Sequence, residues 1–177
     1  MQVFCQQGAI FSEDRNYRYK LWRIWEETKP KAMCVGLNPS TADEFKSDPT
    51  ITILTKMLNK LGYGGFYMTN LFAWVSSDPK DLLSCRDPIG DNDRTLVEVA
   101  ALCDDVIVCW GSFSELENRI EETLAMFSHA LCFGANQDGT PTHPLAMMYK
   151  GKSDDPKLLP YKPERRVQKD NLEKNSE

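Results

Sequence analysis

Four short apolar stretches, each followed by a polar loop, limit what this chain can fold into. They cover residues 32–35, 66–74, 105–110 and 130–133, and their length and composition predict buried strands. Apolar side chains at helical spacing follow over residues 50–61, 91–102 and 115–127, the first behind Asp48-Pro49, a typical helix start. This order predicts an α/β fold of three layers, α/β/α, with a mostly parallel, four-stranded central sheet.

An N-terminal β-hairpin is predicted in front of this pattern. The turn-rich residues 12–16 separate the strand-like residues 9–11 and 17–22. The second strand has a basic face with two interpretations: a solvated edge strand whose charge opposes aggregation, or an edge that contacts phosphate. Its alternating faces carry Tyr17, Tyr19 and Leu21 on one side, and Arg18, Lys20 and Trp22 on the other.

The loop after the first central strand, within MCVGLNPSTAD at residues 33–43, is the first candidate site. Gly36 ends the strand, and Pro39 moves Asn38 out of helical geometry. Ser40 and Thr41 are residue types that cap helices or form turns. Open α/β folds bind ligands at the carboxyl ends of strands, although an ordinary strand-to-helix turn would use the same residues.

The loops after the other three central strands also carry polar residues, namely Asn70, Ser112 and His143. Because the carboxyl ends of parallel strands share one edge, we expect these side chains and Asn38 to line one pocket. Each also has a simpler interpretation. Asn70 would cap a strand end, Ser112 (or Ser114) would cap the next helix, and His143 would hold a turn.

Charge and hydropathy exclude several classes of protein. The 177 residues carry a net charge of −5, which argues against an extended grip on duplex DNA. No apolar run reaches the roughly 18 residues that span a bilayer, and the N-terminus lacks the pattern of a signal peptide. We expect no membrane partner, a single domain over residues 1–163, and a disordered charged tail over residues 164–177.

The six cysteines form neither a C-x-x-C motif nor a cluster with histidine. This scatter predicts reduced thiols in a cytoplasmic protein, with no metal site and no cofactor. Four of the cysteines lie in apolar surroundings and are expected in the core: Cys34, Cys103, Cys109 and Cys132.

Four sequence blocks, GLNPSTAD, YMTNLFAW, VIVCWGS and GTPTHPLAM, resemble the family called domain of unknown function 1643, over roughly residues 8–160. That family implies no established activity. The same blocks are similar, more distantly, to the uracil-DNA glycosylase superfamily. This second resemblance implies a uracil-DNA glycosylase-like fold and a pocket that recognises a nucleobase.

The glycosylase resemblance also implies roles for individual residues. Asn38 matches the residue that positions water, Asn70 the residue that reads the base, and His143 the residue that stabilises charge on the leaving base. Neutral amides and a histidine suit these tasks, since the reaction has oxocarbenium character and needs little base strength. The implied binding residues are Gly36, Leu37, Pro39, Ser40, Thr41, Asn70, Phe72 and Ser112.

Two parts of the glycosylase pattern have no clear match. Leu145 stands where a serine usually follows His-Pro, and the wedge that fills the base stack has only Met147 or Met148 as candidates. A flipped base also needs an aromatic side chain on which to stack. The candidates for stacking are Phe45, Phe72 and Trp74.

These observations leave three functional hypotheses open. The first is a protein that recognises a nucleobase or nucleotide and hydrolyses its N-glycosidic bond. The second is a non-catalytic binder of a nucleotide or nucleotide-derived signal in the same pocket, and the third is a protein-interaction domain. The expected partners are a nucleobase, a nucleotide or a single-stranded nucleic acid.

Overall fold

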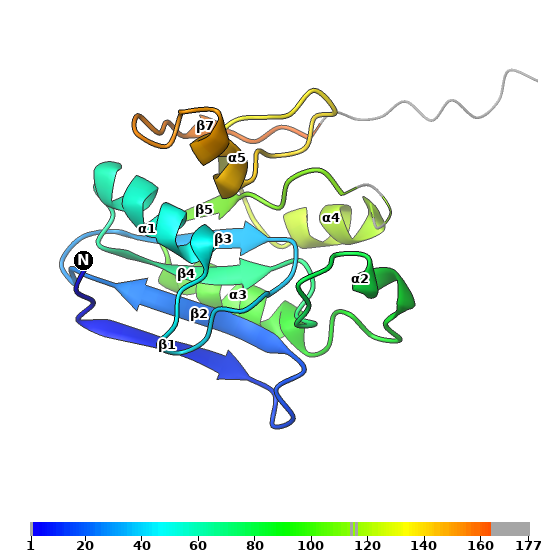
Figure 1. Cartoon of the computed structure of the whole chain (residues 1–177). Helices are drawn as coiled ribbons and strands as arrows, with labels where there is room; N and C mark the ends of the chain where they lie inside the picture. The colour runs from blue at the N-terminus through cyan, green and yellow to red at the C-terminus, as the bar shows by residue number, and fades with distance from the viewer. Residues whose placement is uncertain (1, 114, 116, 164–177) are drawn as a thin grey trace, which may run out of the picture.

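The computed structural model describes residues 2–113, 115 and 117–163, in which seven strands form one mixed sheet (Figure 1). The strand order is β1-β2-β4-β3-β5-β6-β7. The predicted tail, residues 164–177, and Ser114 lie outside the described residues. The strands are β1 (Gln6–Phe11), β2 (Arg18–Ile24), β3 (Lys31–Gly36), β4 (Gly65–Asn70), β5 (Asp105–Val108), β6 (Leu131–Cys132) and β7 (Leu159–Pro160).

The four strands predicted from the apolar stretches lie side by side in the sheet. β4, β3, β5 and β6 pair in parallel, so their carboxyl ends share one edge. The predicted hairpin, β1 and β2, extends the same sheet because β2 pairs antiparallel with β4. β7 adds an antiparallel strand beside β6. The described sheet thus has seven strands and not four. β7 was not predicted because it has only two residues, one of them Pro160, and so shows no strand pattern in the sequence.

The described residues also form five helices, three of which were predicted. Asp48 caps the first of them as expected, because its side chain accepts the backbone N–H of Ile51 at 2.9 Å. The two missed helices, α2 and α5, have 4 and 6 residues and are too short to show helical periodicity. The helices are α1 (Pro49–Lys60), α2 (Asp81–Ser84), α3 (Asn92–Leu102), α4 (Glu117–Leu124) and α5 (Pro144–Tyr149).

Helices cover both faces of the sheet, which gives the chain three layers (Figure 1). Alternate residues of β3 show the division. Ala32 and Cys34 pack in a buried cluster with residues of α1 and α5, whereas Met33 and Val35 pack in a second cluster with residues of α3 and α4. The carboxyl edge of the parallel strands is left between these layers.

A β-bulge interrupts the alternation of side chains along β2. Lys20 pairs with Ile10 but Arg18 pairs with Phe11, so Tyr19 is an extra residue in the strand. A bulge of this kind turns the residues beyond it to the opposite face of the sheet. The face predicted by strict alternation is therefore wrong for Arg18.

The bulge places Arg18 on the α1 face of the sheet. Its guanidinium donates to the carbonyl of Ala42 at 2.9 Å, and Ala42 belongs to the same buried cluster as Leu21. The interpretation of this strand as a solvated edge is also wrong, because β2 lies between β1 and β4 and Arg18 is 3% exposed.

The predicted core cysteines are enclosed by this packing. Cys34, Cys109 and Cys132 are buried, and Cys103 is half-buried. Burial raises the pKa of the Cys109 thiol to about 12, so this group stays protonated near neutral pH. Within the described residues, no helix is long and apolar enough to cross a membrane.

Candidate functional site

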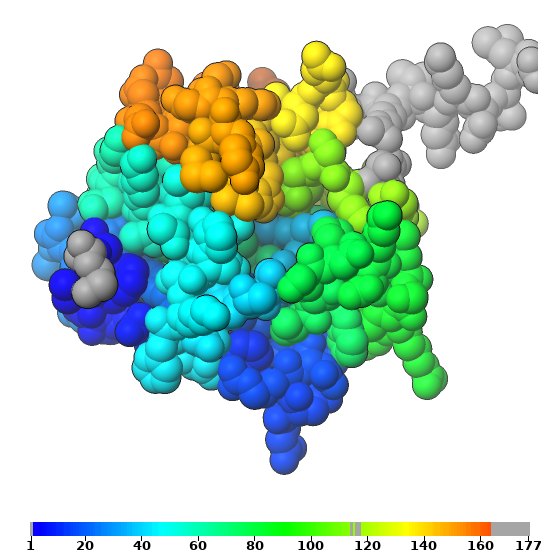
Figure 2. Space-filling view, in the orientation of Figure 1, coloured from blue at the N-terminus to red at the C-terminus, as the bar shows by residue number. Residues whose placement is uncertain are grey.

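A cavity of about 330 Å³ lies at the carboxyl edge of the parallel strands. The molecular surface is hollowed between the cyan segment that holds α1 and the green segment that holds α2 (Figure 2). The ends of β3, β4 and β5 all contribute to its lining. The sequence-predicted residues that line this cavity are Gly36, Leu37, Asn38, Ser40, Asn70, Ser112 and His143.

Three residues predicted to bind substrate are absent from the lining. Pro39 is buried, Thr41 is exposed to solvent, and Phe72 is 2% exposed in the core cluster on the α3 side. Each follows a strand end closely in sequence, but its side chain leaves the loop in another direction. Proximity in sequence alone was therefore not enough to place them.

Asn38 uses its side-chain amide to hold two loops together. Its NH₂ group donates to the carbonyls of Ser76 at 2.9 Å and Pro39 at 3.1 Å, with a longer contact to Trp74 at 3.4 Å. These bonds tie the loop after β3 to the loop after β4. They commit the amide nitrogen to the protein, so the amide oxygen is the atom that remains for a water or a ligand.

Asn70 ends β4 with a side chain that makes no hydrogen bond to the described part of the protein. The residue is 2% exposed, and both Nδ2 and Oδ1 are buried without a partner. The strand-end cap considered from the sequence is therefore not formed. Leaving such groups unpaired costs about 1–3 kcal/mol each, so their retention at a cavity needs an explanation.

Gly36 makes the close approach of Asn70 possible. A Cβ atom at position 36 would lie 2.8 Å from Oδ1 of Asn70 and 2.6 Å from the terminal carbon of Met68. Real side chains do not pack at these separations. The glycine that ends β3 therefore creates the space in which the Asn70 amide sits.

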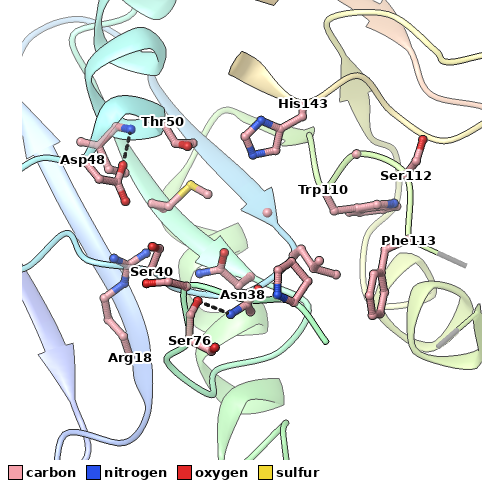
Figure 3. Close-up of a pocket in the computed structure, with 18 residues that line it drawn as sticks. Arg18, Asn38, Ser40, Asp48, Thr50, Ser76, Trp110, Ser112, Phe113 and His143 are labelled. Carbon is pink, nitrogen blue, oxygen red and sulfur yellow. Dashed lines mark hydrogen bonds between the residues drawn. The ribbon is translucent and has the colours of Figure 1, made fainter. Parts of the chain in front are cut away.

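His143 caps α5 and presents its other ring nitrogen to the cavity lining. Nδ1 accepts the backbone N–H of Leu145 at 3.1 Å, which requires the proton of the neutral ring to be on Nε2. Burial lowers the pKa of His143, opposed in part by the charge of Asp48. Figure 3 shows the ring between Thr50 and Trp110. At neutral pH the ring is an uncharged hydrogen-bond donor through Nε2.

A buried arginine lines the same cavity and was not among the predicted site residues. Arg18 reaches it from β2, next to Ser40 and below Asp48 in Figure 3. Desolvation lowers the pKa of Arg18 to about 10, while Asp48 opposes this shift. The guanidinium is still charged at neutral pH. The basic strand had been interpreted as a possible phosphate contact, and this could have indicated Arg18. The sequence does not reveal the bulge, however, and so it does not show that the Arg18 side chain points toward the cavity.

The aromatic residues at the cavity differ from the three candidates proposed for stacking. Trp110 and Phe113 line it and lie beside each other in Figure 3. In contrast, Phe45 is 80% exposed and is not part of the lining. Trp74 packs edge-on against Tyr17, with 5.4 Å between the ring centroids. Trp110 belongs to the sequence block VIVCWGS, but the block does not show in which direction each side chain points once β5 has ended.

Ser112 joins a polar network at the cavity mouth and does not cap a helix. Its hydroxyl lies 3.1 Å from that of Thr140 and within 3.4 Å of the amide nitrogen of Asn136. α4 begins at Glu117, too far along the chain for Ser112 to cap it. The residue therefore keeps a place in the lining by connecting the loops after β5 and β6.

One family model matches most of this chain: the family described as a protein of unknown function (DUF1643) matches residues 18–145. The chain belongs to this family. The match runs from Arg18 to just beyond His143 and so encloses all the residues that line the cavity. Comparisons with curated proteins and with solved structures found no match.

Two further candidates of this DUF1643 chain can now be placed. Met147 is 3% exposed in the core cluster of the α1 face, so it cannot act as a wedge in a base stack. Met148 is 39% exposed and is not part of the cavity lining. Within the described residues, no group of three or more His, Cys, Asp or Glu side chains could hold a metal ion.

Proposed function

We propose that the cavity recognises a nucleobase or nucleotide and that Asn70 contacts the edge of the base. The observation that carries this proposal is the Asn70 amide, which is 2% exposed and whose donor and acceptor both lack a partner among the described residues. A planar base edge offers a donor and an acceptor side by side, which satisfies both amide groups at once. A ligand of this kind removes the cost of the unpaired amide.

Two other features of the cavity support a base in preference to a simple amide or sugar. Phe113 is half-buried, lines the cavity and supplies a flat apolar surface on which a ring can stack, whereas Trp110 beside it is 2% exposed and packs in the core cluster of the α3 face. His143 adds a neutral donor suited to a carbonyl oxygen of the base. The resemblance of the four sequence blocks to the uracil-DNA glycosylase superfamily supports the same assignment of Asn70 and His143.

Hydrolysis of an N-glycosidic bond is the second candidate function, and the tautomer of His143 favours it. In this reaction a water oxygen bonds to the anomeric carbon, the carbon–nitrogen bond breaks, and its electron pair leaves with the base. The Nε2–H of His143 would stabilise the negative charge that develops on a base carbonyl. The amide oxygen of Asn38 would orient the water, whose proton passes to solvent or to the departing base.

A non-catalytic binder would use the same contacts without this step.

Titration calorimetry of the full chain against free bases, nucleosides, nucleotides and single-stranded oligomers measures recognition, and chromatography of released base measures hydrolysis. Asn70→Ala should weaken binding by about 1–3 kcal/mol. Asn59→Ala is the control, because Asn59 lies exposed on α1 and is not part of the lining.

His143→Ala separates the two candidates. In an enzyme it should lower turnover more than affinity, since its bond strengthens as charge develops in the transition state. In a binder no base is released and the change acts on affinity alone. If no ligand of the panel binds the parent chain, the nucleobase proposal is wrong and the protein-interaction hypothesis replaces it.

A further inference from the structure

Arg18 is a buried cation without the partners that buried cations normally have. It is 3% exposed, its Nε has no hydrogen-bond partner among the described residues, and the one hydrogen bond that its side chain makes to them runs from Nη1 to the carbonyl of Ala42 at 2.9 Å. No ion pair within 4.0 Å involves it among the described residues. Buried charges are usually paired and fully hydrogen-bonded, so Arg18 has donors to spare.

Arg23, five residues further along β2, shows what a purely structural arginine looks like in this chain. It is also buried, but all three of its nitrogens donate to the loop before α1 or to its own strand. Its role in holding that loop is complete without a ligand. The acceptors are the carbonyls of Trp22, Asp43, Glu44 and Lys46 and the hydroxyl of Ser47.

The cavity has two chemically different ends. Arg18, Ser40 and Asp48 gather at one, and Trp110 and Phe113 stand at the other (Figure 3). Asp48 is committed to the backbone N–H of Ile51 at the start of α1 and makes no ion pair with Arg18, so it balances the charge without occupying the guanidinium donors.

We propose that Arg18 binds the phosphate of a nucleoside monophosphate whose base lies against Asn70. This inference rests on the proposed nucleobase function and names its substrate class. The free guanidinium donors form charge-assisted hydrogen bonds with phosphate oxygens, and the hydroxyl of Ser40 adds a donor at the same end. The aromatic end takes the base, so one ligand satisfies both Arg18 and Asn70.

The lining favours a single phosphate over a nucleic acid strand. Arg18 is the one Lys or Arg among the described residues that line the cavity, and His143 is neutral there. A strand would need further cations along its backbone, and the chain carries a net charge of −5. A mononucleotide needs one cationic contact, which Arg18 supplies.

The test compares matched ligands by titration calorimetry with the full chain. For each of the common bases, the nucleoside, its 5′- and 3′-monophosphates, ribose 5-phosphate and an oligomer of the same base are titrated. A monophosphate should bind about tenfold or more tightly than its nucleoside. Arg18→Gln should remove this difference and Arg18→Lys should restore part of it. Lys20→Gln, on the same strand but outside the lining, should keep it.

The outcomes separate this inference from the proposed function. Equal affinity for nucleoside and monophosphate overturns the phosphate site and leaves base recognition standing. Binding of ribose 5-phosphate without any effect of the base supports an anion site at Arg18 and overturns base recognition. Tighter binding of the oligomer than of every monophosphate overturns the mononucleotide class. If Arg18→Gln does not fold, the comparison of ligands on the parent chain still decides.

Discussion

The side chain of Asn92 donates to the backbone carbonyl of Asn70 at 2.7 Å. Asn92 thereby fixes the end of β4 from α3, and Arg119 adds a bond from Nε to the next carbonyl, that of Leu71, at 2.7 Å. The backbone at this strand end is held by two buried side chains, while the Asn70 side chain has no hydrogen-bond partner in the part of the chain that the structure describes. The side-chain NH₂ of Asn92 therefore has a structural role at this strand end, whereas the side-chain amide of Asn70 bonds to no described residue.

This difference predicts opposite effects of the same substitution. Asn92→Leu should lower the free energy of unfolding by about 1–3 kcal/mol, because it leaves a buried carbonyl without its donor. Asn70→Leu should leave stability unchanged or raise it, because it replaces unpaired polar atoms with apolar ones of similar shape. Urea unfolding of both variants checks this. A loss of stability in Asn70→Leu as large as in Asn92→Leu would contradict the account of Asn70.

Local sequence patterns were sufficient to predict the central strands and the first helix of the fold. The parallel strands β3, β4, β5 and β6 and the helix α1 follow from apolar stretches, helical spacing and the cap at Asp48. Because parallel strands end at one edge, their order was enough to bring Asn38, Asn70 and His143 to one cavity. The prediction depended on topology and not on side-chain detail.

The features that the sequence missed depend on contacts between distant segments. Arg18 lines the cavity because a bulge reverses the alternation of β2, and bulges have no periodic signature. β7 exists only by pairing with β6. Trp110 and Phe113 line the cavity because of how the loop after β5 leaves the sheet. Phe72 packs in the same core cluster as Trp110, but the direction in which its side chain leaves the loop after β4 keeps it out of the lining.

Gly36→Ala should weaken ligand binding at least tenfold, because the new Cβ displaces the Asn70 amide from a distance of 2.8 Å. The cost in stability should be small, because the two atoms that must move are the ends of the Met68 and Asn70 side chains and not backbone. Gly62→Ala is the matched control. Its φ of +89° disfavours alanine and lowers stability, but it lies beyond the far end of α1 and should leave affinity unchanged. Calorimetry that finds full affinity in Gly36→Ala would contradict this role.

Asn38→Asp should destabilise the protein by about 2 kcal/mol or more, since it removes the donors to the Pro39 and Ser76 carbonyls and places a carboxylate beside them. Asn59→Asp makes the same chemical change at an exposed position and should have little effect. Thermal unfolding of the two variants compares them. Equal melting temperatures would show that the Asn38 amide does not hold the two loops together.

The pH dependence of stability should report on His143. Its pKa is lowered in the folded state by burial, whereas in the unfolded chain it is about 6.5. As pH falls below about 6.5, the unfolded chain takes up a proton that the folded ring resists, so stability decreases until the folded pKa is passed. Above about pH 6.5 the ring is neutral in both states, and the contribution of His143 to stability no longer changes with pH.

His143→Gln should flatten this decrease, and His129→Gln, at the other histidine of the chain, should retain it. Urea unfolding of both variants between pH 5 and 8 measures the slopes. A parent chain whose stability rises as the pH falls through this range, with His143→Gln removing the rise, would show the opposite sign of the pKa shift.

The proposed function depends on what the Asn70 amide contacts when the cavity is filled. The most direct measurement is a crystal structure of the full chain with the tightest-binding ligand of the panel. We expect a base whose edge lies within hydrogen-bond distance, about 3 Å, of both Nδ2 and Oδ1 of Asn70. A ligand bound in the cavity with the Asn70 amide still unpaired, or bound elsewhere on the protein, would contradict it.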